Sequence, residues 1–399
     1  MADRIAILCA ADRWSGVPRT AHALTAAGAE VCIVAPPNSY GAKTRFKLAD
    51  MLAPPAQISR QLGDILRILA EDFGAHCVLA GDDVAFGALA RLMQSGEHEK
   101  LTPATRGMLA RSMPEVRTAA LLASDHDFIL AQQDGLTCRS PRTIGAPAVE
   151  EAVRFAREHR YPVVVKRSGF ASGLGVTICD DEPALRTAVS LAGANGRGFV
   201  LQEFLTGPVY GATVSGVRGR ALAAIAFEKH RVSSANGPTS VARFDPRPDI
   251  LAHAKGLFEN YGLNGYAGFD YIIDAHDRAR FIEINPRIMP TGHFDEHFGV
   301  DLTGAYLAGV RGAPPPPLRE PLNRYVALFP NEWMRDPDSV FLRTGFHDVP
   351  WHDPEVLAAM IDKALLMRSL AEPQPFGDAS RVTTMPYGAM MRPALFGEA

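Results

Sequence analysis

Residues 268–287 read Gly268-Phe-Asp-Tyr-Ile-Ile-Asp-Ala-His-Asp-Arg-Ala-Arg-Phe-Ile-Glu-Ile-Asn-Pro-Arg287, which predicts a strand, a polar turn and a second strand. Side chains alternate along a strand, so we expect Phe281, Glu283 and Asn285 to share one face of the second strand. The two isoleucines between them would take the opposite face. This pattern predicts a hairpin with one apolar and one polar side.

The turn of this hairpin decides which residues of the two strands are neighbours. If the turn is centred between His276 and Asp277, Asp270 lies directly opposite Glu283. Two carboxylates in this position repel each other by roughly 0.2–1 kcal/mol unless a cation lies between them. Magnesium takes oxygen ligands, usually one or two carboxylates together with nucleotide phosphates, and the amide oxygen of Asn285 can join them. The hairpin therefore favours a magnesium–nucleotide site, and the alternative is a solvated polar face on an edge hairpin.

The composition restricts the class of protein. The chain has 399 residues, of which 47% are hydrophobic and 21% charged, which suits two or three domains with apolar cores. Its formal net charge is -3 and it has no basic run, which argues against a nucleic-acid partner. No apolar stretch approaches about 18 residues, so we expect no membrane span. The five scattered cysteines are odd in number and form no CxxC pair, as expected of reduced thiols in a cytoplasmic protein.

The first third of the chain has the spacing of an open α/β domain. Short apolar strands at residues 4–11 and 30–36 flank a helical stretch, and a further strand covers residues 77–80. No GxGxxG sequence follows the first strand, so nothing supports dinucleotide binding there. Gly81-Asp82-Asp83 stands at the carboxyl end of a strand, where parallel sheets usually hold ligands, although a simple turn explains it equally well.

A glycine-rich segment follows the next buried strand. Three valines lead to Lys166, and the chain then opens into a loop that contains Gly169, Ser172, Gly173 and Gly175. Glycines let backbone N–H groups approach an anion, and lysine supplies a point charge for phosphate. The order differs from a Walker A loop, in which the lysine follows the glycines. The segment predicts a phosphate-binding loop, with an ordinary turn as the alternative.

Four features now stand in a fixed order: a valine strand ending in lysine, a glycine-rich hairpin, a Gln-Glu-Phe-Leu strand end, and an Asp…Glu-x-Asn hairpin closed by Pro-Arg. In this order they resemble the ATP-grasp family, over roughly residues 120–312. The resemblance implies an N-terminal open α/β (pre-ATP-grasp) domain, a two-lobed α+β ATP-grasp domain and a small C-terminal extension. We expect these at residues 1–122, 123–312 and 313–399, with the glycine-loop lobe at 123–204 and the metal-binding lobe at 205–312. The run Ala313-Pro-Pro-Pro-Pro-Leu318 marks the last boundary as a stiff linker.

The resemblance also assigns roles to individual residues. It implies that ATP is held by a lysine, a glycine-rich loop and a hinge strand: Lys166, Gly169, Ser172, Gly173, Gly175, Gln202, Glu203, Phe204 and Leu205. It implies three oxygen ligands for Mg2+, or for Mn2+ in its place: Asp270, Glu283 and Asn285. It implies that Arg287 faces the transferred phosphoryl group or a substrate carboxylate. We expect further cations over the substrate pocket, with surface or structural roles as the alternative: Lys229, His230, Arg231 and His293.

Members of this family typically phosphorylate a carboxylate with ATP and then let an amine displace the phosphate. The resemblance thus implies a carboxylate–amine ligase that releases ADP and phosphate and acts on a small acid and a small amine. A homodimer is the default expectation for a soluble protein. One alternative is a carbamoyl-phosphate or carboxylase-type activity on bicarbonate. Another is a sensor or scaffold that binds ATP without turnover, since no acidic residue for the ribose follows the hinge in Gly207-Pro208-Val209.

Overall fold

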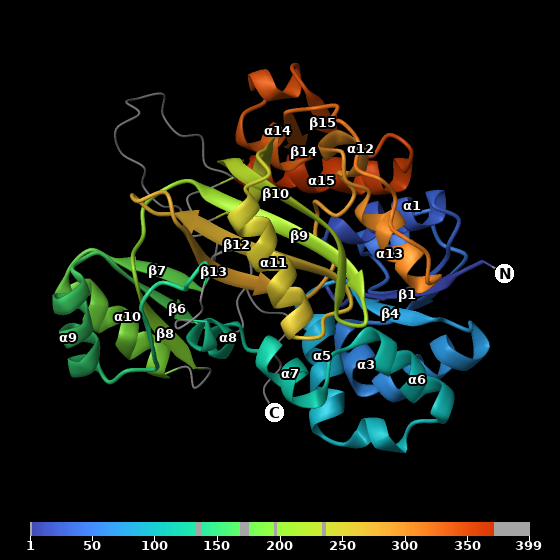
Figure 1. The fold of residues 1–399 in the computed structure, drawn as a ribbon, viewed down its shortest axis with the longest axis horizontal. Helices are drawn as coiled ribbons and strands as arrows, with labels where there is room; N and C mark the ends of the chain where they lie inside the picture. Colours follow the sequence, from blue (N-terminus) through green and yellow to red (C-terminus); the bar gives the residue numbers. More distant parts are fainter. Residues whose placement is uncertain (1, 133–136, 168–174, 195–197, 234–236, 371–399) are drawn as a thin grey trace.

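The computed structural model describes residues 2–132, 137–167, 175–194, 198–233 and 237–370, which form three sheets with helices packed around them (Figure 1). The N-terminal sheet is parallel throughout, in the order β3-β2-β1-β4: β1 (Arg4–Leu8), β2 (Glu30–Ala35), β3 (Ala49–Leu52) and β4 (Cys77–Ala80). Alternate residues of β1 lie in two different apolar clusters, one on each face of this sheet, and helices cover both faces. Ile5 and Ile7 pack against α1 (Gly16–Ala26), whereas Ala6 and Leu8 lie in the cluster that contains α5 (Asp83–Gln94).

Short helices complete the N-terminal part and connect it to the next sheet. They are α2 (Tyr40–Lys43), α3 (Pro55–Arg60), α4 (Leu62–Arg67), η1 (Ile68–Asp72), η2 (Glu97–Lys100), α6 (Pro103–Ser112), α7 (Val116–Leu122) and α8 (Asp125–Ala131). All five cysteines of the chain are buried free thiols.

The small antiparallel sheet has the order β5-β8-β6-β7: β5 (Thr143–Gly145), β6 (Val163–Arg167), β7 (Val176–Cys179) and β8 (Phe199–Glu203). Its core lies on the side of α9 (Val149–His159) and α10 (Glu182–Ala194), which pack against each other. Val163 and Val165 enter this core. Because side chains alternate along β6, Lys166 extends from the opposite face.

The large sheet has the order β13-β12-β9-β10-β11-β14-β15. Its strands are β9 (Val209–Val217), β10 (Arg220–Val232), β11 (Thr239–Phe244), β12 (Gly265–Ile273), β13 (Ala279–Asn285), β14 (Tyr325–Leu328) and β15 (Phe346–Asp348). The helix α11 (Pro248–Asn260) lies across one face (Figure 1). The helix α13 (Leu302–Val310) packs on the other face together with α1.

The segment after the proline run extends the large sheet, because β14 pairs with β11 and β15 pairs with β14. The remaining elements are α12 (Asp295–Phe298), α14 (Asn331–Arg335), η3 (Val340–Leu342) and α15 (Pro354–Leu370). The fold class expected from the sequence is thus confirmed, while the domain limits at residues 122 and 312 stay predictions. Within the described ranges, every helix is too short or too polar to cross a membrane.

Candidate nucleotide and metal site

The acidic hairpin of β12 and β13 has the register expected at its centre. Asp270 lies directly opposite Glu283, and Gly268 lies opposite Asn285. β13 is the edge strand of the large sheet, and β12 lies between β13 and β9. The two carboxylates and the amide therefore stand on one face, as the spacing predicts.

A β-bulge at Ile282 changes the pairing of the residues that lie nearer the turn from the one expected. The register shifts after Asp270, so Phe281 faces Tyr271 and Ile282 is the extra residue. Phe281 is fully buried in the same apolar cluster as Ile284 and Tyr271. The expectation that Phe281 shares the polar face was wrong, because the extra residue reverses the alternation, which a strict two-residue period cannot reveal.

Lys229 of β10 places a positive charge beside this acidic pair. Its Nζ lies 2.6 Å from Asp270 Oδ2, and the two side chains are 18% and 10% exposed, so the pair is largely shielded from water. Asp270, Glu283 and Lys229 together keep a net negative charge. No group of three or more acidic, histidine or cysteine side chains suited to a metal occurs among the described residues. Two carboxylates and the amide of Asn285 are instead a donor set typical of Mg2+ sites that nucleotide phosphates complete.

Lys166 connects the small sheet to the β12–β13 hairpin through a hydrogen bond. Its Nζ donates a hydrogen bond of 3.2 Å to the carbonyl oxygen of Ile282, which is the bulged residue next to Glu283. A bulge removes one residue from the regular ladder, which leaves that carbonyl available to a side chain. The lysine expected to meet phosphates thus lies beside the strand that carries the acidic pair.

Part of the glycine-rich loop can also be located. Gly169, Ser172 and Gly173 lie outside the described residues. Gly175 is buried, and its carbonyl oxygen accepts a hydrogen bond of 2.9 Å from the N–H of Arg167. This bond closes the β6–β7 hairpin at the base of the loop.

The hinge strand β8 is anchored from both sides. Gln202 is 3% exposed and donates to Thr143 Oγ1 at 2.9 Å. Glu203 accepts hydrogen bonds of 3.0 Å from the N–H of Arg142 and from Arg280 Nη2, which lies on β13. Sequence reasoning missed Arg280, because nothing local indicates that a strand arginine will meet an acid so far away along the chain.

The last two hinge residues, Phe204 and Leu205, are partly buried just beyond the end of β8. They immediately follow the anchored Glu203, so the backbone that was expected to take adenine starts from a fixed point.

Arg287 is held by residues from three parts of the chain. Its side chain is 6% exposed, its Nε lies 2.8 Å from Asp83 Oδ1 and its Nη2 donates to Asn285 Oδ1 at 2.7 Å. The guanidinium also packs over the ring of Trp14, with 4.2 Å from Cζ to the ring centroid. Among the described residues, its Nη1 has the weakest partners, which are the Met289 sulfur at 3.2 Å and the Ile288 carbonyl at 3.4 Å.

In the Gly81-Asp82-Asp83 turn, one aspartate stabilises the local fold and the other contacts a residue of the candidate site. Asp82 accepts hydrogen bonds from the N–H groups of Ala10 and Ala11 and caps α5 through Ala85. Asp83 instead pairs with Arg287. The carboxyl end of β4 therefore does contribute to the site. Trp14 was not foreseen, although its place after β1 could have indicated it.

Arg231 and His293, which were expected over the substrate pocket, have partners outside the acidic pair. Arg231 is exposed, and its guanidinium packs over the ring of Phe341, 5.7 Å from the centroid. His293 Nε2 lies 2.9 Å from Asp348 Oδ1, and Asp348 Oδ2 lies 2.7 Å from Arg19 Nη2. Burial raises the pKa of Asp348, but the charges of Arg19 and His293 outweigh burial and hold it below its ordinary value. His293 thus belongs to a buried polar network that joins α1 to β15.

Comparison with known proteins adds independent evidence. A family model described as an ATP-grasp domain matches residues 138–291. The chain is 26% identical over 214 residues to pyruvate carboxylase of Aspergillus niger, covering 49% of this chain and 18% of that protein. It is 26% identical over 155 residues to the vancomycin C-type resistance protein VanC1 of Enterococcus gallinarum, covering 35% and 44%. The chain thus spans less than half the length of these curated relatives.

Solved structures with low sequence identity share the fold. N5-carboxyaminoimidazole synthetase of Staphylococcus aureus, solved with ADP, has a TM-score of 0.60 at 15% identity, covering 81% of each chain. The L-amino acid ligase of Bacillus licheniformis has a TM-score of 0.56 at 16% identity, covering 77% of this chain and 74% of that one. The biotin carboxylase domain of Hydrogenobacter thermophilus 2-oxoglutarate carboxylase, solved with MgADP, has a TM-score of 0.58 at 19% identity, covering 80% and 73%. The fold and the family match together show that this chain carries an ATP-grasp domain over residues 138–291.

Proposed function

We propose that the chain is an ATP-dependent ligase that activates a carboxylate as an acyl phosphate and joins it to an amine, with release of ADP and phosphate. The observation that carries this proposal is the contact of Lys166 with the carbonyl of Ile282, 3.2 Å away and next to Glu283. A nucleotide bound between the two sheets would have the lysine on one side of its phosphates and the acidic pair on the other.

The proposed roles follow from the chemistry of each side chain. Mg2+ held by Asp270, Glu283 and Asn285 would supply charge neutralisation on the phosphate oxygens when it is bound. Lys166 adds a point charge to the same phosphates. Arg287 is fixed in place by its partners and keeps Nη1 weakly engaged, so this nitrogen can donate to the transferred phosphoryl group or to the substrate carboxylate.

The reaction balances without a nucleophile from the protein. An oxygen of the acid attacks the γ-phosphorus, and the bond to the bridging oxygen breaks so that ADP leaves with the electron pair. The amine nitrogen then attacks the acyl carbon, the acyl C–O bond breaks, and phosphate leaves with the electron pair and takes up the proton that the amine loses. Positioning and charge neutralisation supply most of the rate enhancement in phosphoryl transfer.

Two observations favour other candidates and define the controls. Similarity to pyruvate carboxylase and to biotin carboxylase domains favours bicarbonate as the activated acid. The Lys229–Asp270 ion pair favours an ATP-binding sensor or scaffold, because a cation of the protein already engages one of the proposed metal ligands.

The experiment measures ADP release with pools of acids and amines, with bicarbonate alone, and with hydroxylamine to trap an acyl phosphate. ADP together with a hydroxamate supports the ligase, and ADP with bicarbonate alone supports the carboxylase type. ATP binding without ADP under any condition supports the scaffold, and AMP with pyrophosphate contradicts all three. Glu283→Gln should abolish turnover, whereas Glu158→Gln, on a side chain that is 77% exposed, should not.

The buried free thiols support a reducing compartment, and we propose that the protein works in the cytoplasm. We also propose small-molecule substrates and a homodimer, which sedimentation of the purified chain would test.

A further inference from the structure

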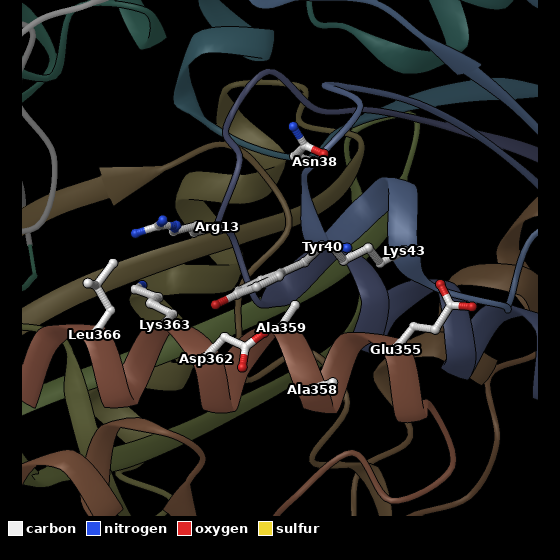
Figure 2. Close-up of a pocket in the computed structure, with 10 residues that line it drawn as sticks. All are labelled: Arg13, Asn38, Tyr40, Lys43, Glu355, Ala358, Ala359, Asp362, Lys363 and Leu366. Atoms are coloured by element: carbon white, nitrogen blue, oxygen red, sulfur yellow. The ribbon is translucent and has the colours of Figure 1, made fainter.

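A pocket of about 480 Å³ lies between the N-terminal sheet and α15 (Figure 2). Its walls come from the loops that follow β1 and β2, from α2 and from the exposed side of α15. None of the described residues assigned above to the nucleotide or the metal lines it. The volume lies within the range of small-molecule pockets, roughly 300–1,000 Å³, and far exceeds the roughly 30 Å³ of one water molecule.

Two cations that form no salt bridge among the described residues meet at one end of this pocket. Figure 2 shows Arg13, from the loop after β1, beside Lys363 of α15, with Lys43 and Glu355 at the other end. Burial, and then the nearby charge of Arg13, hold the pKa of Lys363 below its ordinary value. Neither Arg13 nor Lys363 forms a salt bridge with any part of the chain that the structure describes. Like charges in such a position are stabilised by an anion between them.

Tyr40 adds a hydroxyl group that has no hydrogen-bond partner among the described residues. The residue is only 3% exposed, and its ring packs in a cluster with Val356 and Met360 of α15. The hydroxyl is buried and finds no acceptor or donor within the described residues. In Figure 2 it is directed toward Asp362 and Lys363 on the pocket wall. Burial raises the pKa of Tyr40 to about 12, so the group is a protonated donor at neutral pH.

We propose that this pocket binds a small organic molecule through an oxyanionic head group, either a carboxylate or a phosphate ester. Arg13 offers a planar fork, Lys363 a point charge and Tyr40 a neutral donor, and all three donate to oxygen. Besides Asn38, Lys43, Glu355 and Asp362, the lining contains Ala358, Ala359 and Leu366. These three give it apolar surface that an inorganic ion would not use. The inference stands independently of the ligase activity, because it concerns a second site.

Calorimetric titration of the full chain, without nucleotide and at constant ionic strength, tests this proposal. The probes are succinate, glycerol 3-phosphate and inorganic phosphate. We expect one of the two organic probes to bind at one site per chain and to bind more tightly than inorganic phosphate. The preferred probe tells a carboxylate ligand from a phosphate ester.

Variants assign any binding to this pocket. Lys363→Met, Arg13→Gln and Tyr40→Phe should each weaken it by about tenfold, since each removes a hydrogen bond to a charged group. Lys100→Met, on a lysine that is 73% exposed, is the matched control and should leave it unchanged. Arg13 is itself exposed, so its variant should fold even if a change at Tyr40 disturbs packing.

Three results would overturn the proposal. The first is that no probe binds at millimolar concentration, or that only inorganic phosphate binds, as an adventitious ion. The second is binding that the three pocket variants leave unchanged. The third is displacement of the probe by excess ATP, which would place it in the nucleotide site.

Discussion

Replacing Lys229 by methionine should strengthen the binding of a divalent ion to the acidic hairpin. Lys229 Nζ lies 2.6 Å from Asp270 Oδ2, and both side chains are largely buried, so the lysine and the metal would compete for one carboxylate. Methionine keeps the unbranched stem of the side chain and removes the charged Nζ group with its hydrogen bond to Asp270. The Asp270 carboxylate would then be free for the ion, and one source of repulsion would be lost.

The size of the effect follows from the environment of the pair. Two unit charges about 4 Å apart interact by roughly 4 kcal/mol at an effective dielectric constant of about 20. Lost hydration and side-chain entropy offset most of this, and exposed pairs keep only about 0.2–1 kcal/mol. For this shielded pair we expect about 1.4 kcal/mol, which corresponds to a tenfold lower Kd for the metal.

Electron paramagnetic resonance of free Mn2+ measures this affinity directly, in titrations with and without ADP. Lys100→Met controls for the change in net charge, because that lysine pairs with Glu97 on the surface. Asp270→Asn should lose most of the binding. If Lys229→Met leaves the Mn2+ affinity unchanged or weakens it, the lysine and the ion do not share Asp270, and the proposed position of the metal is wrong.

Three further predictions concern the supports of the site and the stability of the fold. Asp83→Asn removes the charged partner of Arg287, so kcat in an ADP-release assay should fall about tenfold while the KM for ATP changes little; an unchanged kcat would contradict this. Asp348→Asn leaves Arg19 buried without its ion pair, and urea denaturation should show a loss of about 3 kcal/mol in the free energy of unfolding, whereas an unchanged midpoint would show that the pair contributes nothing. Burial lowers the pKa of His253 to about 4, so the unfolded chain binds that proton more readily and stability should fall as pH drops from about 6.5 toward 4. His253→Phe should reduce the loss of stability between pH 7.5 and pH 5, and an identical loss in the variant would exclude this histidine as its source.

The sequence predicted those features that depend on local periodicity and on the order of motifs. The pairing of Asp270 with Glu283 followed from a turn and a two-residue repeat, and the structure has that register. The turn alone does not explain this pairing. Between the turn and Tyr271 the pairs are displaced by one residue from those expected, and the extra residue Ile282 restores the expected pairing at Asp270. The prediction from alternating side chains was therefore right for the pairing of the two acids and wrong for the face on which Phe281 lies.

What the sequence could not predict are contacts between residues distant along the chain. Asp83 and Arg287 meet only because β4 of the N-terminal sheet ends beside the Asn-Pro-Arg segment, where Ile288 donates its N–H to the carbonyl of Ala80 at 2.9 Å. His293 was expected near the substrates, yet its described partner is Asp348, which belongs to a strand added after the proline run. Such pairings depend on how whole layers pack, and no local pattern encodes that packing.

The central claim is that Lys166 and the acidic hairpin hold the phosphates and the metal of one nucleotide. Crystals grown with Mn2+ and a non-hydrolysable ATP analogue test it through the anomalous signal of the ion. We predict one strong peak about 2.1 Å from carboxylate oxygens of Asp270 and Glu283, with Lys166 Nζ contacting the phosphates of the same analogue. A peak elsewhere, or a nucleotide whose phosphates do not contact Lys166, would contradict the account.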